Sequence, residues 1–173
     1  MKHLSETLSK IAREYPPELV AAQLSDVVRI AFHISLLGNA KSVCDIGGGI
    51  GLFSVGCAAL GIKATLVDDF NDPVNKRFGG TALPIHAQYG VEVVKRDAVV
   101  DDLRLPPSSF DAITLFDSME HFHHSPKHLL HSLLDSLVPH GLLIIGCPNC
   151  VNIRKRITVP LGYGEWSSMS NWY

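Results

Sequence analysis

Short apolar runs alternate with helical patterns along this chain. Residues 1–38 carry two helical patterns that Pro16-Pro17 separate, and the second ends at Gly38, a residue common just past a helix. Runs rich in Val, Ile and Leu follow at residues 42–46, 64–67, 91–95, 110–116 and 142–146. These runs predict the buried strands of a parallel sheet.

Two further helical patterns lie between these runs. One spans about residues 51–60. The other spans 125–138 and begins with Ser125-Pro126, a capping residue followed by proline in the first turn. Both patterns separate predicted strands, as crossover helices do.

Residues 73–89 are harder to assign. Their pattern is mixed, and Gly79-Gly80 and Pro84 are expected to break any helix there. The rest of the chain alternates between strands and helices, which predicts a doubly wound α/β fold with helices on both faces of a mostly parallel sheet.

Composition and charge limit the classes of partner. A chain of 173 residues with 46% hydrophobic and 18% charged residues is long enough for one domain with a single core. The net charge of −2 offers no broad attraction for nucleic acid or an anionic membrane. Arg154-Lys155-Arg156 is the one basic cluster, and we interpret it as a solvated helix face. We therefore expect no nucleic-acid and no membrane partner.

The N-terminal region predicts a cytoplasmic protein. The stretch MKHLSETLSK is charged from its start and lacks the apolar core of a signal peptide. The apolar stretch from Leu19 to Leu37 is interrupted by Asp26, Arg29 and His33, so we interpret it as an amphipathic helix rather than a membrane span.

Two patterns resemble metal sites, and we assign a metal to neither. Cys147 and Cys150 form a single CxxC pair, whereas tetrahedral zinc takes four ligands. The run HFHHSPKHLLH has no carboxylate partner nearby, and an exposed polar helix face is the simpler interpretation; its histidines are His121, His123, His124, His128 and His131.

The stretch VCDIGGGIG at 43–51 carries the clearest chemistry. Glycines let a backbone turn tightly and approach a ligand, and the next helix presents free N–H groups. The dinucleotide fingerprint GxGxxG would need a third glycine where Leu52 stands. The pattern is instead DxGxGxG, formed by Asp45, Gly47, Gly49 and Gly51. This spacing disfavours a nicotinamide oxidoreductase.

Three later motifs complete a resemblance. They are Leu66-Val67-Asp68-Asp69-Phe70, Lys95-Arg96-Asp97-Ala98, and a strand beginning Phe110-Asp111 with Glu120-His121 in the loop after it. With the glycine loop, residues 40–150 resemble the class I S-adenosylmethionine-dependent methyltransferases, in particular the small-molecule group with an EH pair after the fourth strand. The resemblance implies a Rossmann-like sheet in the order 3-2-1-4-5, with N-terminal helices.

The resemblance also implies roles for cofactor-binding residues. The glycine loop would wrap the amino-acid end of S-adenosylmethionine, with Asp45 reaching its ammonium group directly or through water. An acidic residue at the end of the second strand can accept two hydrogen bonds from a ribose diol. Asp68 is the preferred residue for this contact, and Asp69 stays possible. Asp97 and Ala98 would contact the adenine.

The loop after the fourth strand would lie beside the transferred methyl group. The resemblance places Phe116, at the end of that strand, and Asp117 and the pair Glu120-His121, in the loop, beside this group. His121 is the candidate base that removes a proton from the acceptor, because its pKa is ordinarily near neutral. In the alternative, Glu120 and His121 are structural and bond to backbone near the cofactor.

The turn before the fifth strand departs slightly from the family. Leu137-Val138-Pro139-His140-Gly141 is similar to the family's LxPGG turn, with His140 replacing its first glycine. We expect the change to be minor, provided that the backbone there is not strictly left-handed.

The C-terminal region departs from the family more clearly. Its sheet usually has two more strands after the fifth, and residues 151–173 contain no convincing pair of strands. We expect an N-terminal helical segment at 1–38, a cofactor-binding core at 39–150 and an incomplete tail at 151–173. The chain is then a fragment of a longer methyltransferase or a shortened protein, whose open fifth strand could join a second copy in a homo-oligomer.

Two functions of different classes remain. The favoured one is an enzyme of class EC 2.1.1 that transfers a methyl group from S-adenosylmethionine to a small molecule and leaves S-adenosylhomocysteine. The alternative is a non-catalytic protein that binds the cofactor or another subunit. Product formation separates the two.

Overall fold

The computed structural model describes residues 2–122, 124–149 and 153–163. It contains a five-stranded sheet, in the order β3-β2-β1-β4-β5, in which every neighbouring pair is parallel. The strands are β1 (Ser42–Ile46), β2 (Lys63–Asp68), β3 (Glu92–Lys95), β4 (Phe110–Phe116) and β5 (Leu137–Gly146). The predicted α/β class and strand order are confirmed.

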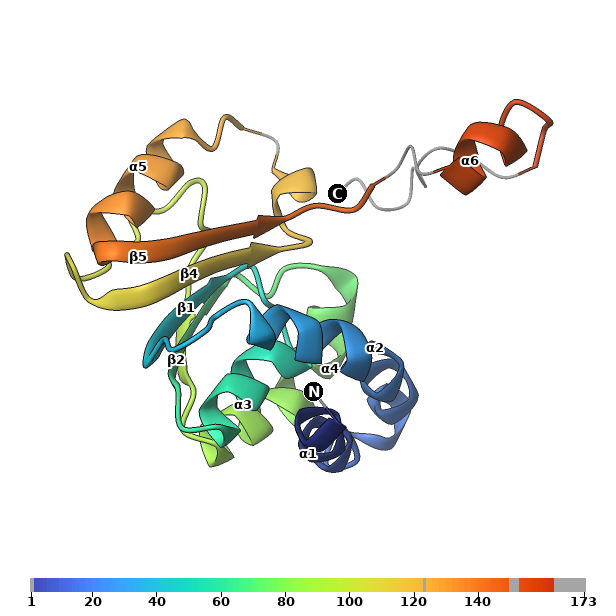
Figure 1. Ribbon diagram of the computed structural model, residues 1–173, viewed down its shortest axis with the longest axis horizontal. Coiled ribbons are helices and arrows are strands. Elements are labelled where there is room, and N and C mark those ends of the chain that lie inside the picture. Colours follow the sequence, from blue (N-terminus) through green and yellow to red (C-terminus); the bar gives the residue numbers. More distant parts are fainter. Residues whose placement is uncertain (1, 123, 150–152, 164–173) are drawn as a thin grey trace.

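Helices cover both faces of this sheet (Figure 1). One face carries α1 (Lys2–Ala12), α2 (Pro17–Ser35), α3 (Leu52–Ala59) and α4 (Pro73–Gln88), and the other carries α5 (Lys127–Ser136). A short 3-10 helix, η1 (Met119–His121), follows β4. The last helix, α6 (Ile153–Thr158), lies apart from the sheet in Figure 1. None of the described helices is long and apolar enough to cross a membrane.

Alternate strand residues feed two hydrophobic clusters, one on each face. Val43 and Ala112 pack with the side chains of α1, α2 and α3, whereas Cys44 and Ile113 pack with Leu129 and Leu133 of α5. Side chains along a strand point to opposite faces in turn, so a strand that is covered on both faces must be apolar throughout. This explains why the three central strands, β1, β2 and β4, were visible as continuous apolar runs.

The expectation that no helix spans residues 73–89 is wrong. Helix α4 runs from Pro73 to Gln88 through both glycines and Pro84. Asp72 caps its start by accepting hydrogen bonds from the N–H groups of Val74 and Asn75. Burial of Ala82 and Ile85 on the core outweighs the unfavourable local residues.

The expectation about His140 is also wrong. Strand β5 begins at Leu137, earlier than predicted, and its register against β4 shifts between the pairs Phe110–Leu137 and Ala112–Leu142. The extra residues are accommodated at Pro139-His140-Gly141, where His140 has a left-handed φ of 66°. A residue with a Cβ is strained in this conformation.

Asp111 joins the starts of β4 and β1. Its Oδ2 atom accepts hydrogen bonds from the backbone N–H groups of Lys41 and Ser42 and from the Ser42 hydroxyl. The Ser42 hydroxyl oxygen in turn accepts from the Asp111 N–H. These bonds lower the pKa of the Asp111 carboxyl. The Phe110-Asp111 motif therefore has a structural role at the amino ends of the strands.

Replacing His140 by glycine is expected to stabilise the fold. Glycine removes the left-handed strain but adds freedom to the unfolded chain, which leaves a net gain of about 0.5–1 kcal/mol. Urea unfolding of His140→Gly measures this gain. Gly141→Ala is the contrasting variant, because its Cβ would lie 2.9 Å from the Val138 carbonyl oxygen, and it should destabilise. A His140→Gly protein no more stable than the parent contradicts the prediction.

Candidate functional site

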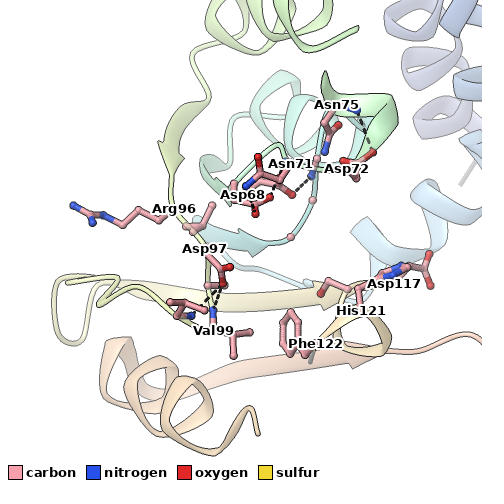
Figure 2. A pocket seen from close by; sticks show the side chains of 18 of the residues that line it. Asp68, Asn71, Asp72, Asn75, Arg96, Asp97, Val99, Asp117, His121 and Phe122 are labelled. Carbon is pink, nitrogen blue, oxygen red and sulfur yellow. Dashed lines mark hydrogen bonds between the residues drawn. The ribbon is translucent and has the colours of Figure 1, made fainter. Parts of the chain in front are cut away.

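A cavity of about 680 Å³ lies at the carboxyl ends of β1, β2, β3 and β4 (Figure 2). Ligands bind at this edge of open α/β sheets, where the loops after neighbouring strands converge. Of the predicted site residues, those that line the cavity are Gly47, Gly49, Asp68, Asp69, Asp97, Ala98, Asp117 and His121. Asp45, Gly51 and Phe116 are not part of the lining.

The glycine loop after β1 needs its glycines for contacts inside the protein. Gly47 and Gly49 have left-handed φ angles of 71° and 57°. A Cβ on Gly47 would lie 2.6 Å from the Ser118 Cβ, and a Cβ on Gly48 would lie 2.1 Å from an oxygen of Asp45. The loop is therefore packed closely against β1 and the segment just after β4, and its backbone forms one wall of the cavity.

Asp45 lies beneath this loop and does not reach the cavity surface. Only 2% of the residue is exposed. Its two carboxyl oxygens accept hydrogen bonds from the hydroxyls of Ser54 and Thr114, at 2.9 and 2.8 Å. Burial raises the pKa of Asp45 to about 6, against the opposing effect of these two bonds. The carboxyl is thus held in place, and a positive charge nearby would favour its ionised form.

Asp68 and Asp69 both line the cavity, so the ambiguity between them persists. Asp68 accepts from the N–H groups of Gly49, at 2.9 Å, and Phe70, at 2.6 Å. Burial raises the Asp68 pKa, and the two N–H bonds oppose the rise. Asp69 instead accepts from the backbone and side chain of Asn71. Asp68 is the one that ties the glycine loop to the end of β2.

Asp97 caps the turn after β3. Its Oδ1 atom accepts from the N–H groups of Val99 and Val100, at 2.9 and 3.1 Å. Ala98, Val99 and Val100 line the cavity beside it. This end of the cavity therefore combines one carboxylate with apolar side chains, a surface suited to a flat heterocycle with an amino group.

Asp117 and His121 lie at the other end of the cavity, away from Arg96 and Asp97 (Figure 2). Asp117 has a left-handed φ of 52° and pairs with Arg29 of α2, which also binds Asp26. Phe116 points instead toward the helices, where its ring stacks on His33 at 3.9 Å. It supports the wall from behind.

Sequence reasoning missed the contribution of two helices. Asn75 of α4 is buried, accepts from the Ile50 N–H at 3.2 Å and faces Gly49. Asp72-Pro73 is a start signal that could have revealed this helix. Arg29 of α2 reaches Asp117 from 88 positions away in the chain, and no local signal announces that contact.

The possible metal motifs gain no support. Among the described residues, no group of three or more His, Cys, Asp or Glu side chains could hold a metal ion. His123 and Cys150 lie outside those residues, and Cys147, within them, is exposed.

Comparisons with known proteins indicate one family. Residues 13–167 match a family described as a methyltransferase domain. The mitochondrial ubiquinone biosynthesis O-methyltransferase of Schizosaccharomyces pombe is 27% identical, in an alignment that covers 71% of this chain and 43% of that protein. The chain thus spans less than half the length of this curated relative.

Solved structures share the fold. A SAM-dependent methyltransferase from Archaeoglobus fulgidus matches with a TM-score of 0.57 and 24% identity, over 75% of this chain and 55% of its own. Coclaurine N-methyltransferase bound to N-methylheliamine and SAH matches with a TM-score of 0.55 and 18% identity, over 70% of this chain and 36% of its own. At these identities the likeness concerns the fold.

Asp45→Asn is expected to remove a pH-dependent loss of stability. Because the Asp45 pKa is raised from 3.8 to about 6, the folded chain holds a proton that the unfolded chain has released between these pH values. The free energy of unfolding therefore falls as pH rises through that window. The neutral amide should remove the fall and add about 1–3 kcal/mol at neutral pH.

Urea unfolding of both proteins on either side of this window measures the effect. Asp111→Asn is the contrasting variant, because the lowered Asp111 pKa stabilises the fold above its unfolded pKa and that contribution is lost as pH falls through the folded pKa. If the free energy of unfolding of Asp45→Asn still falls from acidic to neutral pH as it does in the parent, Asp45 is not the cause of that fall.

Proposed function

The chain belongs to the methyltransferase domain family, and we propose that it transfers a methyl group from S-adenosylmethionine to a small-molecule acceptor. The observation that carries this proposal is the convergence of the glycine loop, Asp68, Asp97 and His121 on one cavity. These groups come from the ends of four adjacent strands, and a ligand that spans them must be extended and carry several polar groups.

The residues present fit this cofactor. The glycine loop forms a wall that side chains would obstruct, and Asp68 and Asp97 place carboxylates beside the cavity. Asp45 is buried with a raised pKa, which fits a site whose ligand supplies an ammonium group nearby. In this assignment Gly47 and Gly49 bind the amino-acid end, with Gly51 and Asp45 behind them. Asp68 or Asp69 binds the ribose, and Asp97 and Ala98 bind the adenine.

Reaction requires alignment and removal of a proton. When bound, S-adenosylmethionine supplies a methyl group on a sulfonium sulfur. Asp117 and Ser118 border the end of the cavity where the acceptor would approach, and they would help to align it with the methyl group. His121 lines this end and accepts the proton that a hydroxyl or ammonium acceptor loses. The alternative role of Glu120 and His121 is to hold the loop.

A non-catalytic role is the second candidate. It is favoured by β5, which pairs only with β4 in the described part of the chain. An edge strand of this kind can join another chain. A homo-oligomer formed through this edge, a cytoplasmic location and the division at residues 38 and 150 remain predictions.

Titration calorimetry should detect binding of S-adenosylmethionine and S-adenosylhomocysteine, but not of NAD. Gly49→Arg should abolish that binding, because Gly49 has a left-handed φ and its Cβ would meet the Asn75 side chain at 3.1 Å. Gly80→Arg is the matched control, since Gly80 is exposed on α4 with no atom within 4 Å of its Cβ position. Equal affinity of the two variants for S-adenosylmethionine contradicts the assigned site.

His121→Gln separates a base from a structural residue. If His121 accepts the proton, the variant should lose about 100-fold or more in kcat while its affinity for S-adenosylmethionine stays unchanged. The measurement is release of S-adenosylhomocysteine with the best acceptor from a panel of phenols and amines. His128→Gln, an exposed change on α5, should be neutral. A parallel fall in cofactor affinity and thermal stability would instead indicate the structural role.

A further inference from the structure

The cavity is strongly acidic. Among the described residues that line it, the carboxylates are Asp68, Asp69, Asp72, Asp97 and Asp117. The one guanidinium in this lining belongs to Arg96, whose side chain extends away from Asp68 and Asp97 in Figure 2. A cavity lined by one sign of charge concentrates ligands of the opposite sign.

Most of these carboxylates serve the loops that carry them. Asp72 caps α4 and Asp97 caps a turn, and Asp68 holds the glycine loop. Their bonds go to backbone N–H groups, which orient the carboxylates without cancelling their charge. They lie on the side of the cavity assigned above to the ribose and adenine.

Asp117 has a different environment, created by α2. Arg29 bonds to its Oδ2 atom and at the same time to Asp26, with the paired side chains about half exposed at 43–45%. One guanidinium shared by two carboxylates leaves this triad of Asp26, Arg29 and Asp117 with a net negative charge. Of the three side chains, Asp117 is the one that lines the cavity.

Aromatic rings adjoin the same triad. His33 stacks on Phe116 with ring centroids 3.9 Å apart, and Phe116 meets Phe53 edge-on at 5.2 Å. Phe32 contacts His33 and is 53% exposed. Burial and the charge of Arg29 lower the pKa of His33, so its imidazole adds no positive charge at neutral pH. None of these four rings lines the cavity, so they pack behind Asp117 and leave the charge at this end to its carboxylate.

We propose that the acceptor is an organic cation, a molecule with a positively charged amine that binds at the end of the cavity beside Asp117. This inference rests on the proposed function and names its substrate class. An anionic acceptor would meet the like charge of Asp117 and of the triad behind it, whereas an ammonium group would be attracted by the same net negative charge.

Three probes of similar shape test the charge preference. Benzylamine, benzyl alcohol and benzoate are titrated into the protein saturated with S-adenosylhomocysteine, with binding followed by ligand-observed NMR. The expected order is benzylamine tightest and benzoate weakest, with about 10-fold between them. Asp26→Asn removes the net negative charge of the triad without altering the cavity lining. It should lower the ratio of benzylamine affinity to benzoate affinity by about 3-fold.

Glu18→Gln provides the matched control. Glu18 is exposed in the first turn of α2, so the variant changes the same charge on the same helix far from Asp117 and should leave the ratio unchanged. Benzoate binding as tightly as benzylamine, or no binding of any probe to the loaded protein, overturns the inference. Failure of S-adenosylhomocysteine itself to bind, seen by calorimetry beforehand, marks failure of the proposed function instead.

Discussion

A single buried carboxyl group, that of Asp45, determines how the glycine loop packs against β4 and α3. Asp45 is the next-to-last residue of β1. It accepts hydrogen bonds from Ser54 of α3 and Thr114 of β4, and it occupies the space where a side chain on Gly48 would lie. Burying an acid in this way costs stability, as its raised pKa shows. A hydrophobic residue of similar size would avoid this cost, but it would leave the buried hydroxyls of Ser54 and Thr114 without their acceptor and would offer no charge beneath the loop.

The same constraint explains the arrangement of the neighbouring groups. Above Asp45, the loop turns through the left-handed conformations of Gly47 and Gly49. Asp68 of β2 and Asn75 of α4 accept hydrogen bonds from N–H groups of this loop. The cavity wall is thus preorganised by bonds within the protein. Strain at functional sites persists where surrounding contacts overdetermine the backbone, and the left-handed Asp117 extends that pattern to the loop after β4.

Local sequence predicted the sheet well and the long-range contacts poorly. Strands β1 and β4 begin and end at the predicted residues, because strands buried on both faces leave uninterrupted apolar runs. Helix α4 was missed, because burial of Ala82 and Ile85 overrode two glycines and a proline. The strain at His140 depends on the register between β4 and β5, and the bond from Arg29 to Asp117 joins positions 88 residues apart. Such features depend on tertiary packing, which local patterns do not encode.

The charged groups at the two ends of the cavity are held by different parts of the structure. At the end near Asp97, the carboxylates cap the turns that begin just after the strands, so their identity is tied to the fold itself. At the end near Asp117, the charge is set by Asp26 and Arg29, which lie on the exposed side of a helix outside the sheet. Residues there can change without disturbing β1 or the glycine loop. The amphipathic stretch from Leu19 to Leu37 therefore has two roles, since one side completes the core while the other side sets the charge around Asp117.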